Sequence, residues 1–235
     1  MKKKNVLLLG LVVLAGVGIF AGFNDNYYQE ENEQMRAEIV AIKENADEVT
    51  REFVDKLENK VERDEAEFWQ VSSDDGSINY IHLTATDQAN DIFIDGQIRT
   101  DGNTNIFLSK GDDRTWIDTS KNIYHADKRS DHNLPLISTT NELSFGELGV
   151  VRELDPDDTV EKTEYGYKVD TTDDLNIGYS LYDHNANLYE TYLDNSQGKV
   201  TSKLVEVDQD VLALYDKYIK LTENLTYTDD ISDLK

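Results

Sequence analysis

Four side chains that could bind a metal ion lie within eight residues of one another: His125, Asp127, Asp131 and His132. Imidazole nitrogens and carboxylate oxygens are common ligands of zinc and other divalent ions. However, only the two aspartates stand four residues apart, which is the spacing that brings side chains together on a helix, and two basic residues interrupt the run. We therefore interpret this segment as a solvated polar loop and predict no metal site.

A second group has the spacing of a calcium-binding loop: Asp183, Asn185, Asn187 and Asp194 occupy its first, third, fifth and twelfth positions. Such a loop requires glycine at the sixth position and a bidentate glutamate at the twelfth. This chain has Leu188 at the sixth position and an aspartate at the twelfth. We predict a hairpin turn here, and leave open whether other acidic loops bind calcium.

Tyrosine is concentrated in the segment 165–192. Exposed tyrosines beside asparagine and aspartate could stack on sugars or contact a protein partner. Half-buried positions in strands also favour tyrosine, and we prefer this explanation. The tyrosines of the segment are Tyr165, Tyr167, Tyr179, Tyr182, Tyr189 and Tyr192.

The sequence contains no signature of a catalytic site. We find no nucleophile elbow, no zinc-protease helix motif and no phosphate-binding loop. The chain has no cysteine, which excludes disulfides, zinc–thiolate sites and thiol nucleophiles. We predict that the protein is not an enzyme and has no catalytic, cofactor-binding or metal-binding residues.

The charge of the chain excludes nucleic acid as a partner. Its 48 acidic and 23 basic residues give a net charge of −25. A surface this acidic repels phosphate groups and anionic lipid headgroups. We interpret the excess of acid mainly as a source of solubility.

The first 23 residues form an apolar leader. Three lysines at positions 2–4 precede residues 6–23, which carry no charge. This apolar run is longer than the usual signal-peptide core of about 7–15 residues and is just long enough to cross a bilayer. We predict that residues 6–23 anchor the protein in the membrane, with a cleaved signal peptide as the alternative. Basic residues before the run and acidic residues after it place the body of the chain outside the cytoplasm, or secreted if the leader is removed.

Residues 24–66 read as an acidic spacer followed by a long amphipathic helix. A continuous helix from about residue 28 to 66 would be roughly 58 Å long. Its apolar stripe could form a coiled coil or pack on a sheet, and the successive four-residue steps after Phe53 favour packing. The stripe consists of Met35, Ile39, Ile42, Ala46, Val49, Phe53, Leu57 and Val61.

Residues 67–228 read as a β-rich domain that ends in a helix beginning near Asp208. Short segments rich in β-branched and aromatic residues alternate with turn residues, which predicts an antiparallel meander. An irregular connection at 127–163 follows this meander. The predicted strands are 78–85, 92–99, 104–109, 114–118 and 122–126, then 165–170, 175–182, 188–194 and 199–207.

Several predicted strands carry large side chains on both faces. In 175–182, Ile177, Tyr179 and Leu181 share one face and Tyr182 lies on the other. In 92–99, Ile92, Ile94 and Ile98 share one face and alternate with Asp95 and Gln97. A sheet that is apolar on both faces must be covered twice or must curve around a ligand. We predict an α+β fold: a curved, half-barrel-like antiparallel sheet packed by the long N-terminal helix and a C-terminal helix, preceded by the membrane segment.

This arrangement resembles the LolA-like bacterial lipoprotein-carrier and lipid-binding families. The resemblance is carried by the glycine turn and aromatic strand of 110–118, Lys-Gly-Asp-Asp-Arg-Thr-Trp-Ile-Asp, and by the hairpin of 192–204. It implies a half-barrel whose helices close over lipid chains. The chain departs from these families in lacking a lipidation cysteine, in its longer first helix and in its final helix.

We predict an extracytoplasmic, non-catalytic binding protein of the bacterial envelope that carries a lipid or other apolar ligand in the curved sheet. The alternative is a protein that binds another envelope protein, or an accessory subunit of a secretion or conjugation complex. The anchor and the absence of any site motif motivate this alternative, which rests on architecture alone.

Overall fold

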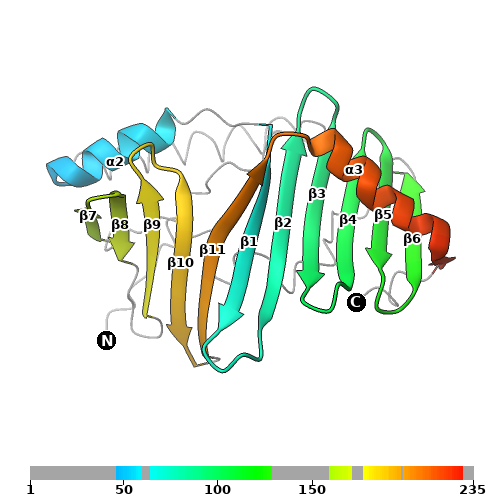
Figure 1. Cartoon of the computed structure of the whole chain (residues 1–235). Coiled ribbons are helices and arrows are strands. Elements are labelled where there is room, and N and C mark those ends of the chain that lie inside the picture. The colour runs from blue at the N-terminus through cyan, green and yellow to red at the C-terminus, as the bar shows by residue number, and fades with distance from the viewer. Residues whose placement is uncertain (1–45, 60–63, 129–158, 171–176, 197, 230–235) are drawn as a thin grey trace, which may run out of the picture. The chain divides into compact units, whose positions relative to one another are not determined.

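The computed structural model describes residues 46–59, 64–128, 159–170, 177–196 and 198–229. These residues belong to two compact units (Figure 1). The first unit contains the described residues up to 59 and those between 159 and 199, and the second contains the remainder. The predicted membrane segment at 6–23 and the first part of the predicted long helix lie outside the described residues. In the part of the chain that is described, no helix is both long and apolar enough to span a bilayer.

The first unit consists of one helix and four antiparallel strands in the order β10-β9-β8-β7. Its helix α2 spans Glu48–Glu58. Its strands are β7 (Thr159–Lys162), β8 (Gly166–Asp170), β9 (Ile177–Asp183) and β10 (Leu188–Asn195). The last three agree with predicted strands, whereas β7 lies within the segment that was predicted to be irregular.

The prediction of one continuous helix to about residue 66 is wrong at both ends of its described part. Asp47 has an extended backbone (φ −69°, ψ 176°), and its carboxylate accepts the N–H of Thr50 at 2.8 Å, so α2 begins only at Glu48. The helix ends at Glu58, and Ala66 is the first residue of a strand. Apolar residues keep their helical spacing through this region. The helix nevertheless begins where the Asp47 carboxylate caps a free backbone N–H, a position that the spacing of apolar residues does not indicate.

The described part of the apolar stripe packs on the sheet of the first unit. Phe53 and Val54 are buried among Tyr167, Val169 and Tyr182. The Phe53 ring centroid lies 5.1 Å from that of Tyr167 and 4.8 Å from that of Tyr182. This part of the stripe therefore follows the predicted packing against the sheet rather than a coiled coil.

The second unit contains eight strands in the order β12-β6-β5-β4-β3-β2-β1-β11. Strands β2 to β6 form the predicted antiparallel meander, and Gly102 and Gly111 have the positive φ that its turns need. Strands β1 and β12 were not predicted. The bounds are β1 Ala66–Ser73, β2 Asn79–Asp87, β3 Ile92–Arg99, β4 Thr104–Lys110, β5 Asp113–Asp118, β6 Ile123–Lys128, β11 Gly198–Asp208 and β12 Thr226–Tyr227.

Helix α3 (Val211–Ile219) and the short helix η3 (Lys220–Asn224) follow β11. The predicted start near Asp208 is wrong by two residues: Asp208 ends β11, and the carboxylate of Asp210 caps the helix by accepting the N–H of Ala213 at 2.9 Å. Val211, Leu214 and Tyr218 of α3 are buried, whereas Leu221 and Leu225, which follow the end of α3, are only partly buried.

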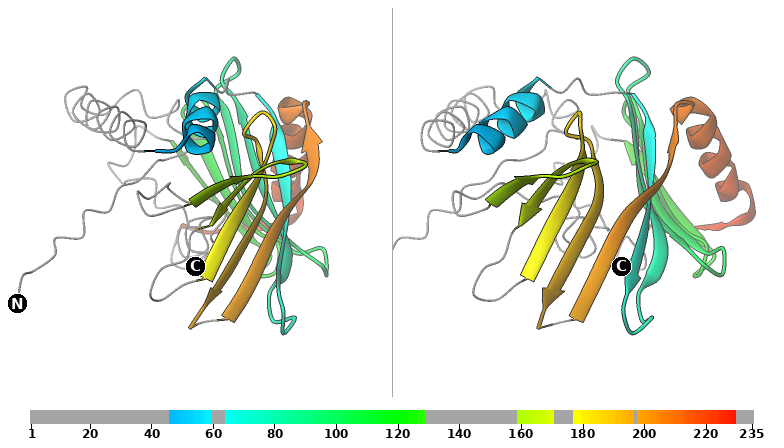
Figure 2. Two further views of the ribbon diagram at one scale, coloured as in Figure 1. Left: turned by 90° about the vertical axis from the view of Figure 1, so that its left-hand side faces the viewer. Right: turned by 60° about the vertical axis from the view of Figure 1, so that its left-hand side comes forward.

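Helix α3 lies along one face of the strands of the second unit (Figure 2). It packs on a dense aliphatic layer that alternate residues of β1 to β5 supply. Its buried strand residues are Ala66, Leu83, Ala85, Ile92, Ile94, Ile106, Leu108 and Ile117. Open antiparallel sheet with short helices is the α+β class that the sequence predicts.

Candidate functional site

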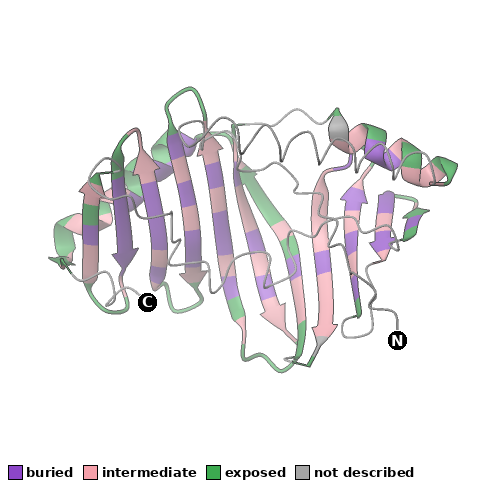
Figure 3. Cartoon of the chain, turned by 180° about the vertical axis from the view of Figure 1, so that it is seen from behind, coloured by how far each residue is buried: buried purple, intermediate pink, exposed green. Residues whose placement is uncertain are grey.

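The strands of the second unit bury their other face as well. Successive side chains of a strand point to opposite faces, so the residues between those that contact α3 lie on the side away from it. Figure 3 views the unit from this side, where buried residues run along β1 to β6. We call this surface the aromatic face. Its buried members, all at most 8% exposed, are Trp69, Val71, Tyr80, His82, Gln97, Phe107, Arg114, Trp116, Asp118, His125 and Ser202.

A row of rings crosses the aromatic face from β3 to β12. The ring centroids of neighbouring residues are 6.1 Å apart for Phe93 and Phe107, and 4.9 Å apart for Phe107 and Trp116. Trp116 lies 5.6 Å from His125, which stacks on Tyr227 at 6.0 Å and 19°. The antiparallel register, which pairs Phe107 with Trp116 and Trp116 with His125, places these rings side by side.

A buried ion pair borders this row. Arg114 donates from Nε to Asp127 Oδ1 at 2.8 Å and from Nη2 to Oδ2 at 2.9 Å. The two side chains are 5% and 7% exposed. The guanidinium carbon also lies 5.5 Å from the centroid of the Trp116 ring. A bidentate pair of this kind fixes both side chains in position and orientation.

The segment with His125, Asp127, Asp131 and His132 was predicted to be a polar loop. This prediction is wrong for His125 and Asp127, which the structure describes. His125 and Asp127 belong to β6, where His125 is buried and the Asp127 side chain is engaged by Arg114. Asp131 and His132 lie outside the described residues. Within the described ranges, no three histidine or acidic side chains are grouped closely enough to hold a metal ion.

Several polar atoms of the aromatic face are buried without a hydrogen-bond partner in the described structure: Tyr80 Oη, Gln97 Nε2, Trp116 Nε1, His125 Nε2 and Ser202 Oγ. A buried donor that is left unpaired costs about 1–3 kcal/mol, and for this reason folded proteins rarely retain one without a partner such as water or a ligand.

Equivalent side chains nearby show what satisfied groups look like. The indole N–H of Trp69 donates to Glu67 Oε2 at 2.9 Å, and Gln70 Nε2 donates to Asn79 Oδ1 at 2.6 Å. The same residue types are thus paired at positions 69 and 70 of β1. The unpaired atoms are therefore particular to the positions of Trp116 and Gln97.

Sequence analysis did not identify these residues. The alternation of β3 set Gln97 apart from the isoleucines, and the structure shows that Gln97 is buried too, with 5% of its surface exposed. In β2, Tyr80 and His82 alternate with the residues that face α3, and the register places His82 opposite Gln97. The signal that could have found them is this cross-strand alignment of polar and aromatic residues, which requires the strand register.

One acid, Asp95, lies among the polar groups at the centre of the aromatic face. His82 Nε2 lies 2.8 Å from Asp95 Oδ1. Burial first, and then the negative charge of Asp95, raise the pKa of Tyr80, so its side chain remains a neutral hydroxyl. The Tyr80 hydroxyl and the Gln97 amide can therefore donate hydrogen bonds without contributing a positive charge.

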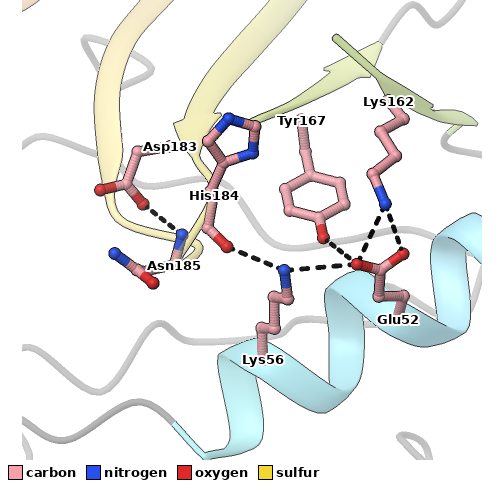
Figure 4. Close-up of polar contacts among 7 residues, drawn as sticks. All are labelled: Glu52, Lys56, Lys162, Tyr167, Asp183, His184 and Asn185. Atoms are coloured by element: carbon pink, nitrogen blue, oxygen red, sulfur yellow. Dashed lines mark hydrogen bonds and ion pairs between the residues drawn. The ribbon is translucent and has the colours of Figure 1, made fainter. Parts of the chain in front are cut away.

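The polar cluster of the first unit has a different character (Figure 4). We call it the α2 seam. Glu52 accepts from Lys162 Nζ at 2.9 Å and from the Tyr167 hydroxyl at 2.8 Å, and it lies 3.3 Å from Lys56 Nζ. Lys56 also donates to the carbonyl of His184 at 2.8 Å. These contacts fasten α2 to β7, β8 and the turn after β9.

The contacts of the α2 seam shift the pKa of its central carboxylate. The hydrogen bonds from Lys162, Tyr167 and Lys56, in that order of influence, lower the pKa of Glu52 to about 2. Each of its partners stabilises the charged form. A carboxylate held in this way is a structural anchor and a poor proton donor or acceptor near neutral pH.

The predicted hairpin turn at Asp183 is confirmed. Its Oδ1 accepts the N–H groups of Asn185 at 2.8 Å and of Asn187 at 2.9 Å, and its Oδ2 accepts from the Asn187 amide at 2.9 Å. Asp194 lies 3.3 Å from Lys199 Nζ. The oxygens that a calcium loop would direct at the metal therefore satisfy turn donors and a lysine instead.

Most tyrosines of 165–192 occupy strand positions, which is the explanation that we preferred from the sequence. Tyr167 and Tyr182 are buried against α2. Tyr179 and Tyr192, directly opposite each other on β9 and β10, stack at 5.3 Å and 20°. Tyr165, which precedes β8, is the exception, with 68% of its surface exposed.

Comparisons with known proteins find a resemblance in fold only. No protein-family model matches the chain, and no curated protein matches it. An uncharacterized conserved protein from Thermus thermophilus is 10% identical over 76% of this chain and 97% of its own, with a TM-score of 0.44. A LolA superfamily protein from Nitrosomonas europaea is 9% identical over 69% of this chain and 94% of its own, with a TM-score of 0.28.

Proposed function

We propose that this chain is an extracytoplasmic, non-catalytic protein that binds an apolar ligand against the aromatic face. The observation that carries the proposal is a sheet buried on both faces, with α3 on one and an aromatic surface on the other. On this face Phe107 and Trp116 form a buried cluster, against which Phe93 and Ile123 pack. Among the described residues, all members of this cluster belong to strands of the sheet. A surface of aromatic side chains with a few polar groups is typical of sites for small apolar ligands.

The proposal predicts that the full chain retains an apolar molecule when it is purified. We expect native mass spectrometry of the full chain, extracted in a mild surfactant, to show a bound species that organic solvent removes. Both tryptophans lie on the aromatic face, so their emission should change when the molecule is removed. Leu212→Ser, on the exposed side of α3, is the control for lipid that adheres to the surface, and it should leave the bound species unchanged. Bare protein under these conditions would contradict the proposal.

We further propose that residues 6–23 anchor the chain and that residues 24–235 lie outside the cytoplasm. The uncharged run after three lysines supports this topology. Protease added to intact spheroplasts should digest the body of the chain and leave a membrane-bound N-terminal fragment. Protection of the whole chain would contradict the proposed orientation, and recovery of the intact chain in the soluble fraction would contradict the anchor.

An alternative function, binding of another envelope protein, is favoured by a separate observation in the first unit. Tyr165 is 68% exposed and Ile177 is 58% exposed, and both are large side chains that a protein partner could contact. Crosslinking in cells from a photoreactive residue at position 165 should trap a protein in that case. The same residue placed at Asp74, in the turn after β1, serves as the control.

A further inference from the structure

We infer that the ligand of the aromatic face carries an uncharged hydrogen-bond acceptor, such as an ester carbonyl, which Tyr80 and Gln97 receive. This inference rests on the proposed function and deepens it. It states which end of an apolar molecule the site recognises: a neutral, oxygen-bearing group at the end of a hydrocarbon chain.

The chemistry of the unpaired atoms selects an acceptor. Gln97 Nε2 and Trp116 Nε1 can only donate a hydrogen bond, and the Tyr80 and Ser202 hydroxyls can donate one. Tyr80, Gln97 and Trp116 are 8%, 5% and 5% exposed, so bulk water does not satisfy them. A hydrocarbon alone would leave all of these donors unpaired, whereas an ester carbonyl, which has two lone pairs, could pair with Tyr80 and Gln97 on their adjacent strands.

The strand register brings two of these donors close together. Gln97 lies opposite His82, and Tyr80 is two residues before His82 on the same face of β2. Such diagonal neighbours across antiparallel strands have Cα atoms about 7–8 Å apart, a distance that a tyrosine and a glutamine can bridge through one shared acceptor. Phe107 and Trp116 then provide an apolar surface on the next two strands along the sheet.

The charges of the face argue against an anionic ligand group. Its acids include Asp95, Asp118 and Asp127, whereas Arg114 is the buried cation among the described residues and is already bound to Asp127. Asp118 accepts the N–H groups of Ser120 and Lys121. A carboxylate or phosphate would therefore meet these acids while the Arg114 guanidinium is already engaged, which makes a neutral acceptor the better match.

Three probes with the same chain separate the possibilities: methyl palmitate, palmitate and hexadecane. Each would be titrated into the delipidated full chain in a fluorinated surfactant, with tryptophan emission as the readout. We expect methyl palmitate to bind about tenfold more tightly than hexadecane, which is the effect of pairing one or two buried donors, and more tightly than palmitate. Equal binding of methyl palmitate and hexadecane, or tighter binding of palmitate, would overturn the inference and leave the proposed function standing.

Substitution of the donor tests the same point independently. Gln97→Leu, which keeps the volume and removes the donor, should reduce the preference for methyl palmitate over hexadecane to about twofold or less, because one donor is lost. Its hexadecane affinity should be unchanged, which shows that the variant is folded. Gln70→Leu removes an amide that is already paired with Asn79 and should keep the full preference. An unchanged preference in Gln97→Leu would overturn the inference, whereas failure of the unsubstituted chain to bind any probe would overturn the proposed function itself.

Discussion

The α2 seam of the first unit and the aromatic face of the second combine the same kinds of side chain in opposite ways. In the seam, Glu52 has three donors around it and is partly exposed, and each of those donors is engaged. On the aromatic face, buried donors such as Gln97 Nε2 have no partner among the described residues. In the α2 seam the polar groups pair with one another and hold the helix to the strands. On the aromatic face, several buried donors have no hydrogen-bond partner among the described residues.

The difference follows from where each polar group lies. Lys162 and Glu52 stand at the rim of a helix–strand contact, where water and a flexible lysine can satisfy a carboxylate from several directions. Tyr80 and Gln97 stand in the middle of a sheet face, where only neighbouring strands or a molecule lying on the face can reach them. Position within the sheet therefore separates a structural cluster from a candidate binding site.

The largest effect is expected from breaking the buried ion pair of the aromatic face. Arg114→Met deprives Asp127 of its bidentate partner at a site that is 7% exposed, so the free energy of unfolding should fall by about 3–5 kcal/mol. Urea denaturation would measure it. The double variant Arg114→Met/Asp127→Leu removes both charges and should lose much less. A loss below about 1 kcal/mol in the single variant would show that the pair is not buried as described.

The sharpest test of the comparison is one substitution made in both regions. Tyr80→Phe removes an unpaired buried hydroxyl and should raise the free energy of unfolding of the delipidated protein by about 1–3 kcal/mol. Tyr167→Phe removes a hydroxyl that donates to Glu52 and should lower it. Thermal unfolding of the two variants beside the unsubstituted chain would show the opposite signs, and a loss of stability in both would refute the distinction.

The helix caps give a smaller and more even effect. Asp47 accepts the N–H of Thr50 at 2.8 Å, and Asp210 accepts that of Ala213 at 2.9 Å. Asp47→Ala and Asp210→Ala should each lower the free energy of unfolding by about 1 kcal/mol, one in each unit. Hydrogen exchange should show faster opening of α2 in the first variant and of α3 in the second. Faster exchange in the other unit's helix would contradict the assignment.

The pH dependence of the α2 seam is the most subtle test. The pKa of Glu52 is lowered to about 2 from the ordinary value of 4.5 that it has in the unfolded chain. Its contribution to stability is therefore present above the unfolded pKa and is lost as the pH falls through the folded pKa. Glu52→Gln should flatten the acid side of the stability curve between about pH 4.5 and 2. A curve with an unchanged acid slope would show that the seam does not hold the carboxylate charged.

Local spacing predicted the meander well. The predicted strand 92–99 matches β3, and the others of the meander agree within two residues, because period-two alternation and turn glycines are properties of neighbouring residues. The same reasoning failed at the helix boundaries. Asp47 and Asp208 show why: a cap depends on which N–H the carboxylate reaches, and apolar spacing carries no information about that choice.

By itself, the sequence determined the composition of the protein: an acidic, cysteine-free chain with an uncharged run near its start and strands that carry large side chains on both faces. It showed Gln97 and Asp95 alternating with isoleucines, but a single strand shows only that residues alternate and not which face is covered. The tertiary structure decided which face is buried and which donors are paired, since these depend on the register that sets His82 opposite Gln97 and Trp116 opposite His125. Hydrogen bonding between distant strands is a property of their alignment, and that alignment exists only in the folded chain.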